Sequence, residues 1–350
     1  NIKHGRIDFS SPSYTDDEHF AQRIKRAKPQ PGDIIITREA PIGDVGMIPE
    51  NTECCLGQRM VLLRANQSVC DNFYLLYSLQ SLYVQHQISW SEGTGTTVSN
   101  LRIPHLEQIQ IPYLPLEQQA KISSVLRALE EKIENNRRLN DNLQQQAMSL
   151  YAEMFLNSSD SNVTSGTLSD IAVITMGQSP SGSSYNEDGV GEVFYQGRAE
   201  FGFRFPKRRL FTTEPKRMAE AGDVLLSVRA PVGDLNIAYE RCCIGRGLGA
   251  IHSKTDHSSF VLYTMFALRS QLDVFNGEGT VFGSINRDAL NAIPIDIPPV
   301  TEIDQFEVVA HPIDELIRAN YEENCRLEAI RDSLLPKLMS GEIDVSAVQL

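Results

Sequence analysis

Positive charge and aromatic rings alternate in one stretch of this sequence, residues 194–217, which reads FYQGRAEFGFRFPKRRLFTTEPKR. The stretch holds seven Lys and Arg residues and two Glu residues, a local balance of +5 in a chain of net charge −13. Guanidinium and ammonium groups bind phosphates, and amide and guanidinium groups hydrogen-bond base edges. The alternative interpretation is a solvated hairpin with half-buried phenylalanines. The predicted phosphate ligands are Arg204, Lys207, Arg208 and Arg209, and the predicted base-edge contacts are Gln196 and Arg198.

Two loops rich in glycine and threonine offer a second kind of candidate. They read SEGTGTTVSN at residues 91–100 and GEGTVFGSIN at residues 277–286. Backbone amides and hydroxyl groups in such loops can hold phosphates. A tight connection that needs glycine for its backbone angles would have the same composition. The candidate residues are Thr94, Thr96, Thr97, Thr280 and Ser284.

These loops belong to a long internal duplication. GDIIITREAPIGDVG begins at residue 32 and GDVLLSVRAPVGDLN begins at residue 222, an offset of 190. Gly57 matches Gly245 at an offset of 188, and the two glycine-threonine loops match at 186. Solenoid repeats have periods of about 20 to 50 residues, so this ordered series indicates duplication of whole domains. In each copy, branched apolar runs bounded by Gly-Asp and Ala-Pro predict a β-rich part.

Two arginines lie inside the repeated phrase, one position out of step with each other. Arg38 is in the first copy and Arg229 is in the second. Either side chain can face a nucleic acid, and a structural ion pair with Asp44 or Asp234 is an equally good expectation.

Each β-rich part is followed by a sequence typical of a long helix. Residues 116–155 contain no Pro or Gly, and residues 300–341 contain Pro312 and Pro336, each of which should mark a boundary or a kink. Apolar residues at alternating spacings of four and three predict a coiled-coil seam. Buried asparagine costs stability but fixes register, so these helices are expected to pack on each other rather than to lie apart on the surface. The asparagines of the predicted seam are Asn136, Asn140, Asn320 and Asn324.

Bulk composition narrows the class of protein. Of 350 residues, 41% are hydrophobic, which is ordinary for a globular chain, and no apolar run approaches the length of a membrane span. The first residues lack the apolar core of a signal peptide, so a cytoplasmic location is expected. The adjacent cysteine pairs at residues 54–55 and 242–243 lack metal-site spacing, so no metal is predicted and the cysteines are expected to pack as small apolar groups.

Four segments resemble a known family. They are PLEQQAKISSVLRALEEKIENN from Pro115, LSDIAVITMGQSPSGSSYNEDGVGEVFYQGRAEFG from Leu168, GDVLLSVRAPVGD from Gly222 and SLLPKLMSGEI from Ser333. Together they cover nearly the whole chain in the family's order. The sequence is similar to the specificity subunits of type I restriction-modification systems.

The resemblance implies an α+β fold with two β-rich target-recognition domains, separated by two long, mutually packed coiled-coil helices in a pseudo-two-fold repeat. The expected divisions are residues 1–115 for the first recognition domain, 116–157 for the central conserved helix, 158–301 for the second recognition domain and 302–350 for the C-terminal conserved helix. The first domain is expected to lack its opening segment, because the counterpart of Thr167 would precede residue 1.

The resemblance also implies a function without catalysis in this chain. Each recognition domain would read one half of a bipartite double-stranded DNA target, and the helices would set the gap and dock methyltransferase subunits. A motor-nuclease subunit would join the complex, and S-adenosylmethionine, ATP and Mg would belong to those partners. Residues 300–345 hold eleven acidic and four basic residues, which suits a protein partner better than DNA. The alternative is a truncated or degenerate specificity subunit that assembles with partners without full DNA reading.

Overall fold

The computed structural model describes residues 2–3, 5–9, 12–90, 100–157, 163–277 and 283–348. The chain divides into two compact units. Unit 1 consists of Asn1–Asn136 and Tyr321–Leu350, and unit 2 consists of Arg137–Asn320. Each unit therefore combines a β-rich part with sections of the two long helices, α5 (Leu116–Tyr151) and α10 (Val300–Met339).

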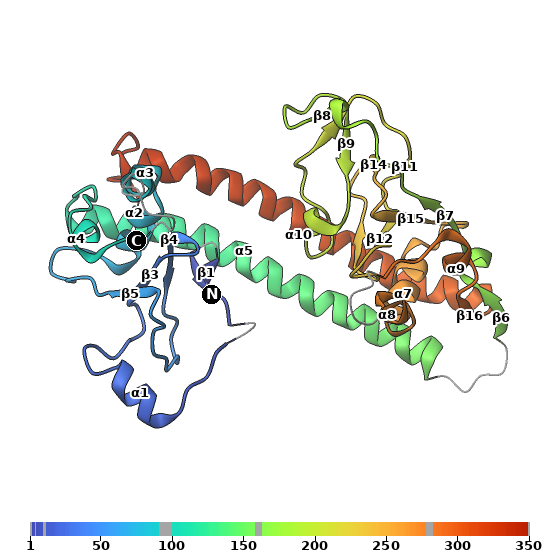
Figure 1. Cartoon of the computed structure of the whole chain (residues 1–350), viewed down its shortest axis with the longest axis horizontal. Coiled ribbons are helices and arrows are strands. Elements are labelled where there is room, and N and C mark those ends of the chain that lie inside the picture. The colour runs from blue at the N-terminus through green and yellow to red at the C-terminus, as the bar shows by residue number, and fades with distance from the viewer. Residues whose placement is uncertain are drawn as a thin grey trace. The chain divides into compact units, whose positions relative to one another are not determined.

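Unit 1 is built on a five-stranded sheet of order β1-β2-β4-β3-β5 (Figure 1). Its strands are β1 (Ile2–Lys3), β2 (Arg6–Ile7), β3 (Ile34–Arg38), β4 (Ile42–Met47) and β5 (Met60–Leu63). β3 pairs antiparallel with β4 and with β5, whereas β2 pairs parallel with β4. The consecutive isoleucines of β3 are all buried, as expected for a central strand covered on both faces.

The short helices of unit 1 are α1 (Asp17–Arg23), α2 (Asn72–Gln80), α3 (Leu82–Trp90) and α4 (Ile103–Leu106). Helix α2 begins after Asp71, whose carboxylate accepts the backbone N–H of Tyr74 at 2.9 Å and satisfies an otherwise unpaired donor. Leucines of α2 and apolar residues of α3 pack on the sheet. This core includes Ile34, Ile36, Val45, Leu76, Leu79, Val84 and Ile88.

The other face of α2 contacts the long helices. Tyr74 and Tyr77 are buried in a cluster that joins the beginning of α5 to the end of α10 within unit 1. The cluster also contains Ile122, Leu126, Leu338, Met339 and Val345. Because early residues of α5 meet late residues of α10, the two helices run antiparallel in this unit.

Unit 2 holds three sheets, of order β11-β14-β9-β10-β8, β13-β12-β15-β7 and β16-β6 (Figure 1). The strands are β6 (Thr164–Thr167), β7 (Ala172–Met176), β8 (Tyr185–Asn186), β9 (Glu192–Tyr195), β10 (Phe211–Thr212), β11 (Met218–Ala219), β12 (Val224–Ser227), β13 (Leu235–Ile237), β14 (Cys242–Ile244), β15 (Leu248–Ser253) and β16 (Pro294–Ile297). The helices are α6 (Leu168–Ile171), α7 (Ser258–Ala267), α8 (Arg269–Asp273) and α9 (Arg287–Asn291), with 3-10 turns at Gly182–Ser184, Arg198–Glu200 and Val274–Asn276.

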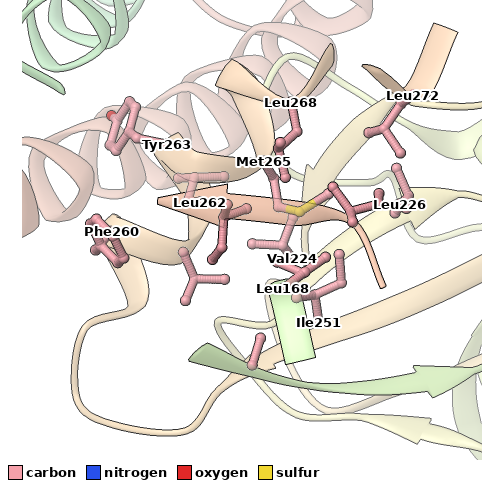
Figure 2. Close-up of a cluster of buried hydrophobic side chains, with 14 of the residues drawn as sticks. Leu168, Val224, Leu226, Ile251, Phe260, Leu262, Tyr263, Met265, Leu268 and Leu272 are labelled. Carbon is pink, nitrogen blue, oxygen red and sulfur yellow. The ribbon is translucent and has the colours of Figure 1, made fainter. Parts of the chain in front are cut away.

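The main core of unit 2 lies between the β12-β15-β7 sheet and helix α7 (Figure 2). Almost every residue of α7 is buried, which explains why its sequence, SSFVLYTMFA, carries apolar residues all around. Tyr151, the last residue of α5, packs edge-on against Phe306 of α10, and Phe155, in the turn that follows α5, packs edge-on against Phe260 of α7. The β13-β12-β15-β7 sheet and the sections of the long helices in unit 2 thus share one core.

The predicted α+β class is confirmed, whereas the observed bounds of the long helices differ from the expected divisions at 116–157 and 302–350. Helix α5 ends at Tyr151 and continues as a π-helical turn, Ala152–Leu156. Helix α10 does not break at Pro312, because the residue lies inside its 40-residue span. Proline cannot donate to the carbonyl of Val308, but Val308 is 75% exposed and water can satisfy that oxygen. Pro336 lies inside the same span, so the predicted helix boundary is absent at both prolines, and the alternative of a kink stays a prediction.

The asparagines of the seam are buried and paired. In unit 1, Asn136 donates to the Asn324 side chain at 2.9 Å and Asn324 donates to the Ile133 carbonyl. In unit 2, Asn320 donates to the Asn140 side chain at 2.8 Å and Asn140 donates to the Ile317 carbonyl. Residues 133, 136 and 140 of α5 correspond to residues 317, 320 and 324 of α10 at an offset of 184, so the two sets of bonds are equivalent contacts of the repeat. The predicted packing of the two helices and the repeated register contacts are confirmed.

Candidate nucleic-acid interface

The repeated phrase forms the same hairpin in both units. Gly32 and Gly222 have φ angles of +85° and +90°, a left-handed conformation that glycine adopts without strain. The aspartate that follows accepts a backbone N–H three residues earlier, from Gln30 in unit 1 and from Glu220 in unit 2, each at 2.8 Å. These aspartates are therefore structural groups that close a turn.

Each of these aspartates also contacts a basic side chain at equivalent positions of the repeat. Asp33 accepts two hydrogen bonds from Arg64, at 2.7 and 2.6 Å, and Asp223 lies 2.5 Å from His252 Nδ1. Burial alone would raise the pKa of the Asp33 carboxyl, but the bonds from Arg64 and the turn backbone hold that pKa below its usual value. The pair stabilises unit 1 while the carboxylate is charged.

The arginines of the repeated phrase differ in role. The backbone carbonyl of Arg38 accepts the N–H of Leu101, and that of Val228 accepts the N–H of Ile285, so Arg38 is equivalent to Val228. Its guanidinium donates to the Leu101 carbonyl and to Asn100, which is a structural role. The expected alternative pairing with Asp44 is not found among the described contacts. Arg229 is exposed and forms a β-bridge with Ser284.

Asp234 of the same hairpin binds other partners than Arg229. Its carboxylate pairs with Arg198 and, at 3.0 Å, with Arg269. The predicted alternative of an Arg229–Asp234 pair is therefore wrong. Arg269 also pairs with Asp273 at 3.4 Å, so two half-exposed guanidinium groups and two carboxylates balance each other at this end of the hairpin.

The basic stretch 194–217, the ribbon, runs from β9 through β10 to the start of β11 and mixes exposed with buried side chains, Phe194, Tyr195 and Phe205 being among the buried ones. Gln196, Arg198, Lys207, Arg208 and Arg209 are exposed, as base or phosphate contact requires. Arg208 pairs with Glu240, and Arg209 pairs with Glu200 and Glu187. Lys207 has no acidic partner within the described part of the chain. The stretch is thus partly neutralised by carboxylates that a DNA phosphate would have to replace.

Arg204 does not belong to that exposed set. Its side chain is 3% exposed, and it pairs with Asp314 of α10 at 3.1 Å and donates to the Tyr263 hydroxyl. Tyr263 in turn donates to Asp314 at 2.9 Å. Burial raises the pKa of Asp314, and the Arg204 guanidinium opposes that shift. The prediction of a phosphate ligand is wrong for Arg204, which joins the ribbon to the helix inside unit 2.

Four of the predicted contact residues lie outside the described part of the chain. They are Thr94, Thr96, Thr97 and Thr280. Ser284 is described, and its backbone bridge to Arg229 places the end of the second glycine-threonine loop beside the repeated hairpin. For this loop, the predicted phosphate contact stays a prediction.

The described residues show neither a group of acidic, histidine and cysteine side chains able to hold a metal ion nor a helix apolar enough to span a membrane. Cys242 and Cys243 are fully buried in β14, and burial raises the pKa of the Cys242 thiol to about 12. A buried, protonated thiol packs as a small apolar group. The expected role of this cysteine pair is confirmed.

A known protein family matches the sequence of both copies of the repeat. A family model described as the type I restriction modification DNA specificity domain matches residues 1–145 and again 160–324. The chain belongs to this family. The two matched segments correspond to the two copies of the repeat, so the duplication found in the sequence is that of the family's recognition module.

Individual relatives of the family cover most of the chain. A Methanocaldococcus jannaschii protein assigned to the MjaX type I restriction enzyme as its specificity subunit is 30% identical over 366 residues, covering 98% of this chain and 86% of that protein. The MjaIX specificity subunit from the same organism is 24% identical, over 90% of this chain and 78% of its own length. The crystal structure of a type I restriction-modification S subunit from M. genitalium has a similar fold, with a TM-score of 0.55, 19% identity and coverage of 89% and 83%.

Proposed function

We propose that this chain is the DNA-reading subunit of a type I restriction-modification complex and that its two copies read the two halves of a bipartite target. The observation that supports this proposal is that the same structural hydrogen bonds occur in both copies of the repeat. Both units build the same hairpin with the same aspartate turn, while the residues on its surface differ. One fold with two different surfaces suits the reading of two different half-sites.

In unit 2, exposed cations would fix the protein on the duplex. Lys207, Lys216 and Arg217 are exposed and have no carboxylate partner among the described residues. Phosphate contacts of this kind set position and orientation, whereas base-edge contacts carry the sequence information. Arg208 and Arg209 would join them by exchanging a carboxylate for a phosphate. The acidic charge of the chain as a whole requires such contacts to be local.

We infer that α10 provides a surface for partner proteins. In unit 2 its outer side exposes Val308, Val309 and Leu316 between acidic residues. Exposed apolar residues with acidic neighbours suit a protein partner and repel DNA. Methyltransferase subunits are the proposed occupants, and a motor-nuclease subunit would join through the complex. Methylation and cleavage, with S-adenosylmethionine, ATP and Mg, would reside in those partners.

A selection from randomised DNA tests this function. The full chain, in complex with its methyltransferase subunits, is incubated with a randomised duplex library at several salt concentrations, and bound DNA is sequenced. A motif of two parts separated by a constant gap is the expected result. Enrichment of one half-site alone would mean that only one unit reads DNA. Uniform binding without a motif would refute the proposal and favour an assembly protein that does not read sequence.

A further inference from the structure

Several strand ends of unit 2 meet at one place. Strands β7, β9, β12 and β14 end there, and β15 begins there, because Leu248 pairs with Ser227 and Gly249 pairs with Met176. β14 runs parallel to β9, which brings their C-terminal ends together. The strand-end cluster consists of the connecting residues 177–179, 195–198 and 244–248. Loops at the ends of rigid strands are well placed to carry binding residues.

Backbone hydrogen bonds hold these loops to one another. Gly245 N donates to the Tyr195 carbonyl at 2.8 Å, and Gly247 N donates to the Gln196 carbonyl at 3.2 Å. On the other side, Gln178 N donates to the Ile244 carbonyl at 3.0 Å. The loop between β14 and β15 therefore lies between the other two loops and is bonded to both.

Glycine makes this close approach possible. A Cβ at residue 177 would lie 2.2 Å from the Gly245 carbonyl oxygen, and a Cβ at residue 247 would lie 2.8 Å from the Gln196 oxygen. No side chain fits at such distances, so backbone packs directly on backbone. Gly245 and Gly247 thus serve to assemble the cluster, and the Arg246 side chain between them is exposed, whereas the next side chain, Leu248, is buried in the core.

The strand-end cluster carries three exposed polar side chains. Gln178, Gln196 and Arg246 are all exposed, and none has a side-chain hydrogen bond or ion pair among the described residues. Arg246 differs in this from the ribbon residues Arg208 and Arg209, whose guanidinium groups are held by carboxylates. Arginine pairs with guanine O6 and N7, and glutamine pairs with adenine N6 and N7. The cluster presents the side chains that discriminate bases, unpaired and on a rigid support.

Unit 1 contains the same turn with a different residue at its tip. Met60 N donates to the Gly57 carbonyl at 3.3 Å, as Leu248 N donates to the Gly245 carbonyl at 2.9 Å. Gln58 occupies the position of Arg246 and is also exposed. A purely structural turn would not explain why both copies place an exposed hydrogen-bonding side chain at its tip, an amide in unit 1 and a guanidinium in unit 2, which prefer different bases.

We propose that Gln178, Gln196 and Arg246 form the base-reading site of unit 2, with Arg246 selecting a guanine in the major groove, and that Gln58 occupies the equivalent reading position in unit 1. This inference rests on the proposed function. It adds two residues, Gln178 and Arg246, to the DNA contacts expected in unit 2 and assigns Gln58 to unit 1.

The test compares Arg246→Ala and Arg246→Gln with Arg241→Ala. Arg241 is an exposed arginine that precedes β14 and is paired with Glu192 and Glu220, so its replacement controls for loss of charge. Selection from the randomised library is repeated with each full-length variant in its complex. Arg246→Ala should lose preference at one base pair of one half-site, by roughly 5- to 150-fold. Arg246→Gln should move that preference toward adenine, and Arg241→Ala should keep the wild-type motif.

Salt dependence and melting separate the alternatives. The Arg246 side chain is exposed, so the variants should melt at the wild-type temperature, and a base contact should leave the salt slope of binding unchanged. An unchanged motif in Arg246→Ala, or uniform weakening with a shallower salt slope, would overturn the assignment and make Arg246 a spectator or a phosphate contact. Gln196→Ala provides a second, independent test, because it should lose base preference at a neighbouring base pair in the same selection. If the wild-type complex selects no motif, the proposed function itself fails.

Discussion

Replacing Arg204 with methionine removes the cation that faces a largely buried carboxylate and keeps most of the side-chain volume. The side chains of Arg204 and Asp314 are only 3% and 15% exposed, so water cannot take the place of the lost partner. Breaking a buried ion pair in this way costs about 3–5 kcal/mol. For a domain of roughly 150–250 residues, that corresponds to a fall in melting temperature of roughly 6–20 °C.

Calorimetry of the full chain would measure this effect on the transition of unit 2. Replacing both partners, Arg204→Met with Asp314→Leu, leaves no unpaired charge and should recover most of the lost stability. Arg241→Met serves as the matched control, because that ion pair is exposed and its loss should cost less than about 1 kcal/mol. If Arg204→Met melts within a degree of the wild type, or if the double variant is no better than the single one, the buried pair does not hold the ribbon to α10.

Three further results are expected. Because Arg64 lowers the pKa of Asp33, this pair stabilises unit 1 fully above the unfolded pKa of an aspartate, and the stabilisation is lost as pH falls through the folded pKa. The melting temperature of unit 1 should therefore fall with this acid titration in the wild type, and Arg64→Met should remove that part of the fall. Asn136→Leu should destabilise unit 1 by about 1–3 kcal/mol because the side-chain oxygen of Asn324 loses its donor and stays buried, whereas changing both asparagines to leucine should raise the melting temperature. A single variant that melts higher than the double one would contradict this reasoning. Lys207→Ala should lower the salt slope of DNA binding by about one with an unchanged selected motif, and an equal slope would remove this residue from the phosphate contacts.

Much of the fold could be predicted because its signals are local or repeated. The spacing of apolar residues predicts the long helices, and recurrence of the asparagines at an offset of 184 predicts their pairing, which the contacts of Asn136 and Asn140 confirm. Pro312 misled the prediction, since proline removes a hydrogen bond but a solvent-exposed carbonyl tolerates the loss. The sequence pattern cannot tell which side of a helix that carbonyl faces.

The candidate site was less predictable because charge composition does not reveal ion pairing. Arg204 and Arg208 are close in the same basic stretch, yet one is buried against α10 and the other is exposed. The partner that decides this, Asp314, lies 110 residues further along the chain and has no sequence signal to distinguish it from other helix acids. Arg246 has no sequence signal of its own, because only the strand topology shows that its neighbours Gly245 and Gly247 join three loops.

The turn around Gly57 and Gly245 separates folding from specificity. Its shape depends on a main-chain hydrogen bond in both copies and, in unit 2, also on the absent side chains of Gly245 and Gly247, whereas its tip residue is exposed. Replacement at that tip should therefore be almost neutral for stability, so new DNA targets can arise by single substitutions without passing through a poorly folded intermediate. The same independence would let the two copies diverge in what they select while the scaffold of each stays unchanged, and it makes residues 58 and 246 practical starting points for engineering altered target preference.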